Sequence, residues 1–235
     1  MIRCVSVENM RRSDAHTVAN AVPSLVLMHR AALGVFKAHV WQGRTAIVVG
    51  SGNNGGDGFA LACILQSNNY DCAVFTVSQK YSSDSAHYAQ KAKEAHIPVL
   101  PFESGCLAGF TTVVDCLLGT GFQGHLRREY RFAIEEINDS DAFVISVDIN
   151  SGMNGDTGNA ELAVKSNLTV TIGYIKVGLI KQQAAKYIKK LVCADIGIIL
   201  FREEWNIYTP DDPVVPDAYL CPKWLDPNLI YSIEE

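Results

Sequence analysis

The stretch "AIVVGSGNNGGDGFALACIL", Ala46 to Leu65, is the most informative part of the sequence for the fold. It opens with an apolar, β-branched run that predicts a buried strand ending at Gly50. Glycines crowd the next eight positions, and a helical pattern begins near Gly58. This order of strand, glycine-rich turn and helix is typical of a ligand-binding loop in an α/β protein.

The composition is that of a globular protein. With 235 residues, 48% of them hydrophobic and 19% charged, the chain suffices for one large α/β domain with a full core. The net charge of -5 provides no basic surface for a phosphate backbone, so we expect no nucleic-acid partner. The seven cysteines include no CxxC pair and mostly lie in apolar runs, which favours free thiols and a cytoplasmic location.

Membrane insertion is not expected. The longest apolar region, residues 25–40, is interrupted by His29, Arg30 and Lys37. The amino end lacks the apolar segment of a signal peptide. We therefore expect neither a membrane span nor a leader.

Short apolar runs alternate with helical periodicity along the chain. Helices are expected at about residues 7–19 and 24–40, within an amino-terminal extension over residues 1–43, and then at 59–66, 85–95 and 128–137. Strands are expected in the β-branched runs at 45–50, 72–77, 111–119, 142–148, 168–174 and 191–197. Strands that are apolar throughout belong in a parallel sheet covered on both faces.

We therefore predict an α/β fold, a three-layer αβα sandwich with a Rossmann-like, doubly wound, mainly parallel sheet. Residues 1–235 form a single domain in this prediction. The last part, residues 201–235, is rich in proline and is expected to run as an irregular strap over the core.

The glycine-rich turn has three interpretations. Gly50 to Gly55 matches the GxGxxG pattern of dinucleotide-binding folds, but no acidic residue ends the second strand, "FTVSQK", to hold the ribose, which disfavours an ordinary NAD dehydrogenase. A P-loop is excluded because no Gly-Lys-Ser/Thr follows. In the third interpretation Asp57 caps the following helix. Capping explains one residue and leaves the rest of the Asn-Asn-Gly-Gly-Asp run without a role.

Two further strands end in acidic, glycine-containing segments. Asp115 precedes "CLLGTGFQGH", and Asp148 precedes "INSG". Taken singly, Asp115 could cap a turn and Asp148 could begin an Asx-turn. In open α/β sheets, however, ligands bind outside the carboxyl ends of the strands. We therefore expect all three loops to face one crevice.

Together these segments resemble a known family. "GSGNNGGDG", "VDCLLGTGFQG", "VDINSG" and "TVTIGYIKVGL", in this order and spacing, resemble the YjeF N-terminal domain, the NAD(P)H-hydrate epimerases, and "SLVLMHRAAL" resembles that family's LM-x-x-A-G helix. The likeness covers about residues 7–200. It implies an isomerase that interconverts the R and S forms of hydrated NADH and NADPH, so that a separate NAD(P)H-hydrate dehydratase can act downstream on one of them.

The resemblance also implies the site residues. Asp148 contacts the substrate and is our candidate general acid or base, and a potassium ion lies between Asn54, Asp115 and Ser151. The substrate is held by two segments, Asn53, Asn54, Gly55, Gly56 and Asp57, and Gly119, Thr120, Gly121, Phe122, Gln123, Gly124 and His125. The chemistry is compatible, because glycines let backbone N–H groups approach phosphate and a hard cation prefers oxygen ligands. The sequence holds no Cys or His cluster, so no zinc site is expected.

Two departures from the family pattern matter. The family usually has Pro where this chain has Asn150, and we expect the loss of that constraint to loosen the loop that aims Asp148 and Ser151. The residues after Leu200 are too few for a fused dehydratase domain, so this chain is expected to epimerise only. Lys176 matches a lysine of the family and could neutralise phosphate, assist proton transfer or lie at the surface without a role.

Two alternatives concern function and assembly. A non-catalytic YjeF-like module could keep the pocket and serve as a scaffold, although a scaffold has no need of Asp115 and Asp148 together. The apolar face of residues 24–40 predicts a homodimer through the amino-terminal helices, with ordinary core packing as the rival explanation.

Overall fold

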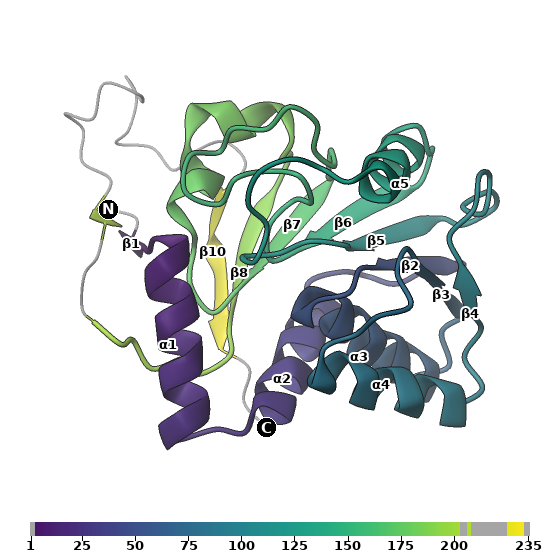
Figure 1. Ribbon diagram of the computed structural model, residues 1–235, viewed down its shortest axis with the longest axis horizontal. Helices are drawn as coiled ribbons and strands as arrows, with labels where there is room; N and C mark the ends of the chain where they lie inside the picture. Colours follow the sequence, from purple (N-terminus) through teal and green to yellow (C-terminus); the bar gives the residue numbers. More distant parts are fainter. Residues whose placement is uncertain (1–2, 203–205, 208–224, 233–235) are drawn as a thin grey trace.

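The computed structural model describes residues 3–202, 206–207 and 225–232. Its centre is an eight-stranded sheet in the order β10-β8-β7-β6-β5-β2-β3-β4, in which all neighbouring strands are parallel (Figure 1). The strands are β2 (Thr45–Val49), β3 (Cys72–Thr76), β4 (Val99–Pro101), β5 (Thr112–Cys116), β6 (Phe143–Val147), β7 (Leu168–Ile172), β8 (Leu191–Asp195) and β10 (Leu225–Ser232). The predicted doubly wound parallel sheet is confirmed.

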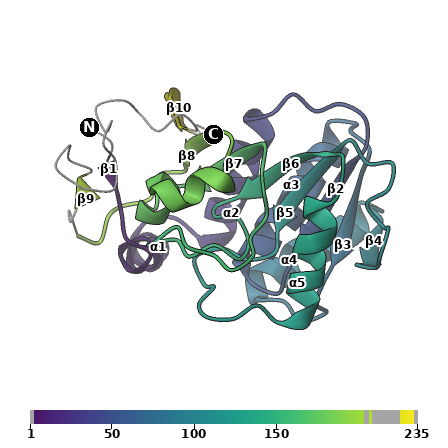
Figure 2. The ribbon, with the colours of Figure 1, turned by 90° about the horizontal axis from the view of Figure 1, so that it is seen from above.

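Helices cover both faces of the sheet. One face carries α2 (Ser24–Lys37), α3 (Asn53–Ser67) and α4 (Ser83–Glu94), and the other carries α5 (Arg128–Asn138) with the 3-10 helices η1 (Val177–Ile180) and η2 (Gln182–Lys186) (Figures 1 and 2). Side chains of β2 alternate between two apolar clusters, so that Ile47 and Val49 belong to one and Ala46 and Val48 to the other. Burial on both faces explains why the strands are apolar throughout.

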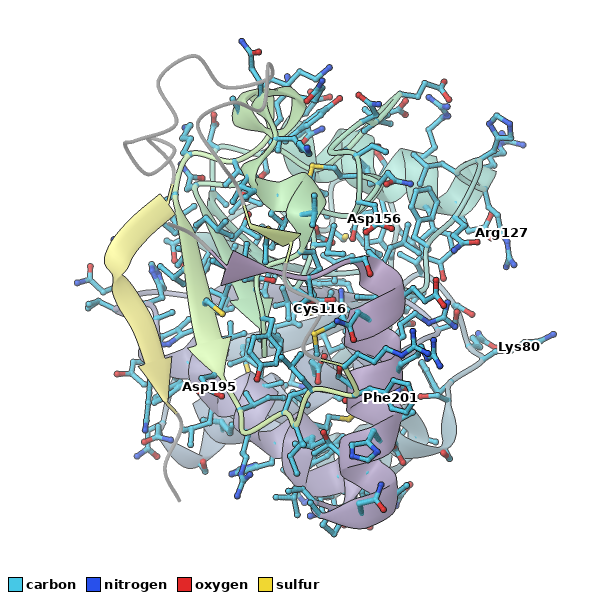
Figure 3. The ribbon with its side chains drawn as sticks, turned by 90° about the vertical axis from the view of Figure 1, so that its left-hand side faces the viewer. Lys80, Cys116, Arg127, Asp156, Asp195 and Phe201 are labelled. Atoms are coloured by element: carbon cyan, nitrogen blue, oxygen red, sulfur yellow. The ribbon has the colours of Figure 1, made fainter. Side chains whose placement is uncertain are left out.

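The amino-terminal helix α1 (Val7–Asn20) is fixed at both ends. At its start Asp156 Oδ1 accepts a hydrogen bond from Val7 N at 2.7 Å, and the short strand β1 (Arg3–Cys4) pairs with β9 (Asn206–Ile207). Towards its end Thr17 Oγ1 accepts one from Ile199 N at 2.9 Å. Figure 3 shows Asp156 near the start of α1 and Phe201 beside the helix. The extension is therefore anchored to the body of the domain.

The structure differs from the expected boundaries in one important place. Helix α3 begins at Asn53, with Gly52 as its N-cap, and not near Gly58. Asp57 is therefore a residue of the helix, and its interpretation as an N-cap is wrong. Glycines are commonly helix-breaking, but here they permit close packing, because a Cβ on Gly55 would lie 2.3 Å from Gly50 O.

The sequence pattern did not predict several short elements. β4 has only three residues, which are not buried, and η1 and η2 are single turns between strands. The carboxyl-terminal segment is not wholly irregular, since residues 225–232 form β10 at the edge of the sheet, where prolines are tolerated. Most of the remaining strap, including 208–224, lies outside the described residues. Among the described helices none has both the length and the apolar character needed to cross a bilayer.

Candidate functional site

The carboxyl ends of β2, β5, β6, β7 and β8 open into one cavity of about 610 Å³. Because all these strands are parallel, the three acidic, glycine-rich loops do meet at this edge. The predicted site residues that line the cavity are Asn53, Asn54, Asp57, Gly119, Thr120, Gly121, Phe122, Gln123, His125 and Asp148. Two segments far apart in the sequence therefore line one cavity.

Three predicted substrate residues lie elsewhere. Gly55 and Gly56 are buried and do not line the cavity, because they serve the packing of α3. A Cβ on Gly56 would lie 2.6 Å from the Met28 side chain. Gly124 lines a smaller, separate pocket together with residues of the segment 152–161. These glycines shape the site, while Asn53, Asn54 and Asp57 face the cavity.

Asp115 and Ser151 form a buried, saturated cluster behind the cavity. Asp115 Oδ1 accepts from Ser151 Oγ at 2.5 Å and Leu117 N at 3.2 Å, while Oδ2 accepts from Ser146 Oγ and Ser151 N, both at 2.9 Å. The side chain is fully buried. Burial raises the pKa of this carboxyl, and the four hydrogen bonds oppose that rise. Asp115 thus ties β5, β6 and the loop after β6 together.

Asn54 presents an unpaired oxygen next to this cluster. Its Nδ2 donates to Leu118 O at 2.9 Å, and Leu118 O also accepts from Ser151 Oγ at 3.3 Å. Its Oδ1 is buried and has no hydrogen-bond partner within the described part of the chain. A buried amide oxygen without a donor carries an energetic penalty unless a ligand satisfies it. Such an oxygen suits a cation, and it lies on the cavity wall.

Asn150 does not loosen the loop that follows β6, so the expectation from the sequence is wrong. Its side chain is fully buried, and Nδ2 donates to Val164 O, Ser166 Oγ and Tyr187 O at 2.9, 3.0 and 3.2 Å. Its Oδ1 accepts from Thr169 Oγ1 at 2.6 Å. Hydrogen bonds from the amide to three segments thus replace the rigidity that a proline would give. These bonds fix the position of the loop that carries Asp148 and Ser151.

Asp148 adopts an unusual backbone conformation beside a buried lysine. Its φ is 68°, in the left-handed region, and Ile149 N donates to Val147 O at 2.9 Å across it, which closes a tight three-residue turn. Lys176, whose side chain is 1% exposed, forms an ion pair with Asp148 Oδ1. The Asp148 side chain is 13% exposed and lines the cavity. Residues with strained backbone conformations often occur at functional sites, and Asp148 combines such a conformation with a position on the cavity wall.

Asp57 is a second carboxyl group in the cavity and has no ion-pair or hydrogen-bond partner among the described residues. Its side chain is half-buried in the second turn of α3. Burial, and then the charges of Asp148 and Asp14, raise the pKa of Asp57 well above that of an ordinary aspartate, and Lys176 opposes this. Asp57 therefore retains a proton to a higher pH than an exposed carboxyl group.

The flanking helices also contribute to the cavity, which the sequence pattern does not predict. Arg11 and Asp14 of α1, Asp84 of α4 and Arg127 before α5 also line the cavity. The polar run around Arg11 was visible in the sequence, but no local signal shows that α1 folds back over the carboxyl edge of the sheet. Neither Arg11 nor Arg127 makes an ion pair within the described residues.

Comparison with known proteins places this architecture in one family. The profile of the YjeF-related protein N-terminus matches residues 24–178. A Lentilactobacillus buchneri protein named NAD(P)H-hydrate epimerase is 35% identical over 207 residues, which cover 84% of this chain and 96% of the relative. A Limosilactobacillus reuteri protein of the same name is 37% identical over 205 residues, with coverage of 83% and 96%.

A longer relative and a solved structure complete the comparison. The Archaeoglobus fulgidus protein named bifunctional NAD(P)H-hydrate repair enzyme Nnr is 35% identical over 200 residues, which cover 83% of this chain and 41% of that protein. The crystal structure of the yeast protein ynu0 matches with a TM-score of 0.67 at 20% identity, covering 75% of this chain and 83% of the yeast chain. At that identity the structural likeness concerns the fold.

Proposed function

Because this chain belongs to the family of the YjeF-related protein N-terminus, we propose that it is an NAD(P)H-hydrate epimerase, an isomerase that interconverts the R and S forms of hydrated NADH and NADPH. The observation that carries the proposal is the position of Asp148, a paired and partly exposed carboxylate at the wall of a cavity lined by both predicted substrate segments. The cavity is large enough for part of a dinucleotide.

The anionic diphosphate of the substrate finds positive partners in the cavity. The N-terminus of α3 lines it through Ser51, Gly52 and Asn53, and helix N-termini attract phosphate through free N–H groups and the helix dipole. Arg11 and Arg127 line the same cavity and have no carboxylate partners within the described residues. These groups offset the acidic side chains around the proposed reacting end.

The chemistry requires two proton transfers. The substrate carbon carries a hydroxyl group and the ring nitrogen. When an acid protonates the hydroxyl, its C–O bond breaks, water leaves, and the nitrogen lone pair forms an iminium ion. Water then attacks the other face of that carbon and gives its proton to a base, so the net reaction changes only the configuration. General acid or base groups contribute roughly 10²- to 10⁴-fold each to such steps.

Asp148 and Asp57 are the candidate groups for these transfers. Asp148 lines the cavity beside the Lys176 ammonium, and this position suits a base for the incoming water. Asp57, whose pKa is raised by burial, suits the acid that protonates the departing hydroxyl. Two carboxyl groups in environments of different charge can thereby divide the two roles.

The residues present fit the potassium ion that the family resemblance implies. Asn54 Oδ1 is the unpaired buried oxygen. The Nδ2 atom of the same side chain and Ser151 Oγ both donate to Leu118 O, and Ser151 Oγ also donates to Asp115 Oδ1. Bound between Asn54, Asp115 and Ser151, the ion would supply positive charge near the phosphates of the substrate. The four donors on Asp115 fix the carboxylate in place for this purpose.

One experiment tests the function. A purified single epimer of hydrated NADH is mixed with the protein in potassium buffer, and the opposite epimer is followed by chromatography. We expect equilibration well above the spontaneous rate. Equilibration no faster than in buffer alone would favour the alternative, a non-catalytic YjeF-like scaffold, and retained binding of NAD⁺ in that sample would show that the pocket is intact.

Assembly and location extend the proposal. The apolar face of α2 is used in the core, where Leu27, Met28 and Val35 are buried. Support for a homodimer through the amino-terminal helices comes instead from exposed Val18 on α1 and from Ile199 and Phe201 beside it. A monomeric mass by light scattering at micromolar concentration would contradict the dimer.

The six described cysteines are free, in keeping with a cytoplasmic enzyme that supplies a separate dehydratase.

A further inference from the structure

Lys176 is an almost fully buried lysine in the wall of the cavity. It is 1% exposed, and its position after β7 brings it under the turn that carries Asp148. Its ammonium donates to Asp148 Oδ1, to Thr171 Oγ1 at 3.2 Å and to Ile172 O at 2.6 Å. An ammonium has three N–H donors. All three are therefore used within the protein.

This saturation excludes the roles that the sequence left open for Lys176. A lysine with no free donor cannot also bind substrate phosphate, and its burial excludes a surface position. Proton transfer from the ammonium to the substrate would break its bonds to β7 and leave Asp148 without a counter-charge. Removing one partner of a buried ion pair is costly, so the pair is expected to stay intact during turnover.

The two oxygens of Asp148 have different surroundings. Oδ1 is held by Lys176, whereas Oδ2 has no hydrogen-bond partner among the residues that the structure describes. Oδ2 lies towards Gly119 in the opposite loop, since a Cβ on that glycine would be 3.2 Å from it. Gly119 lines the cavity, so the absence of a side chain there leaves Oδ2 accessible.

We propose that Lys176 is a positioning residue, which holds Asp148 Oδ1 in the strained turn and leaves Oδ2 as the atom that meets the substrate. The left-handed backbone at Asp148 needs support from its surroundings, because such conformations persist only where other contacts fix them. Lys176, which is itself held by Thr171 and Ile172 of β7, provides that support, and Asp148 N adds a hydrogen bond to Val170 O at 2.8 Å. The inference rests on the proposed epimerase function and assigns Lys176 no contact with the substrate.

A double-mutant cycle tests this assignment. In Lys176→Met we expect kcat to fall by roughly 10²-fold, because misplacement of a catalytic group by about 1 Å has that effect, with KM and NAD⁺ affinity nearly unchanged. In Asp148→Asn the loss of Lys176 should cost no further activity, because the lysine acts only through that carboxylate. Lys165→Met, an exposed lysine on another loop, is the matched control and should keep the parent kcat.

Stability separates positioning from a merely structural effect. Each single variant leaves one partner of the pair alone and should melt at a lower temperature, whereas Lys176→Met with Asp148→Asn removes both charges and should recover much of the loss. Its kcat should nevertheless stay at the level of Asp148→Asn. If Lys176→Met fails to fold, Thr171→Val removes one acceptor of the ammonium and should lower kcat with little change in KM.

The outcomes are distinguishable. A parent protein that does not exceed the spontaneous rate contradicts the epimerase function itself. An active parent with a Lys176→Met variant of equal kcat overturns the positioning role, as does a raised KM without a change in kcat. Losses that multiply in the double variant would show that Lys176 acts on the substrate independently of Asp148.

Discussion

Asp115 and Asp148 come from neighbouring strands of one sheet edge and have opposite surroundings. Asp115 is fully buried, and four donors occupy its two oxygens. Asp148 lines the cavity, and only Oδ1 has a partner, Lys176, among the described residues. A carboxylate whose oxygens all accept hydrogen bonds holds neighbouring segments together and has little capacity left to bind a substrate. A carboxylate with one free oxygen retains that capacity. The difference supports a structural role for Asp115, beside the proposed ion, and the proposed role in proton transfer for Asp148.

The largest expected effect on stability comes from removing the saturated carboxylate. Asp115→Ala leaves two buried serines and two N–H groups without their acceptor, and each unsatisfied buried group costs roughly 1–3 kcal/mol. We expect a loss of about 4 kcal/mol in the free energy of unfolding, by urea denaturation. Asp141→Ala, at an exposed position away from the cavity, is the control. If the free energy of unfolding falls no more than in this control, Asp115 does not have the proposed structural role.

A somewhat smaller loss is expected at Asn150. Asn150→Ala removes an NH2 group whose two N–H donors serve three acceptors and an oxygen that accepts one bond, so we expect about 3 kcal/mol of destabilisation. Asn150→Pro, which restores the family pattern, should also destabilise this chain, because Thr169 and Ser166 are arranged for the amide. If the proline variant melts above the parent, the hydrogen-bonded loop is not what holds Ser151 and Asp148.

Potassium should raise the thermal stability of the protein moderately. A ligand that binds only the folded state at ten times its Kd stabilises it by about 1.4 kcal/mol. We expect a higher Tm in potassium than in choline chloride at equal ionic strength, and Asn54→Ala should abolish the difference by removing the unpaired oxygen. Equal melting curves of the parent in both salts would contradict the ion site.

The smallest effect is a pH-dependent gain at Asp57. Its folded-state pKa lies above the unfolded value of about 3.9, so it makes the parent less stable as pH rises from that value through the raised one. Asp57→Asn should therefore raise the Tm at pH 8, and the gain should vanish near pH 4, while epimerisation falls. An identical shift at both pH values would show that the effect is not one of ionisation.

The sequence predicted the sheet and its edge because both depend on local patterns. Apolar runs of strand length and the glycine-rich loops near Gly50 and Gly119 sufficed to bring Asn54, Asp57 and Asp148 to one cavity. The predicted start of α3 was wrong because a run of glycines in the sequence is typical of a turn. Only the close approach of Gly50 O to Gly55 shows that these glycines are needed for packing of the helix.

The rest depends on contacts between segments far apart in the chain. Arg11 reaches the cavity wall because hydrogen bonds such as that from Val7 N to Asp156 Oδ1 anchor α1, and no local pattern encodes these contacts. The role of Asn150 was misjudged because its partners come from three other segments. Likewise, nothing in "YIKVGL" shows that Lys176 is buried against Asp148.

The most direct test of the central claim is the rate at which Asp148→Asn equilibrates a single epimer of hydrated NADH in potassium buffer, measured beside its affinity for NAD⁺. Asparagine keeps the size and hydrogen-bonding capacity of the side chain but removes its acid/base function. We expect the rate to fall roughly 10²- to 10⁴-fold while the affinity for NAD⁺ is largely retained. A variant that equilibrates the epimers as fast as the parent would show that the chemistry does not pass through Asp148.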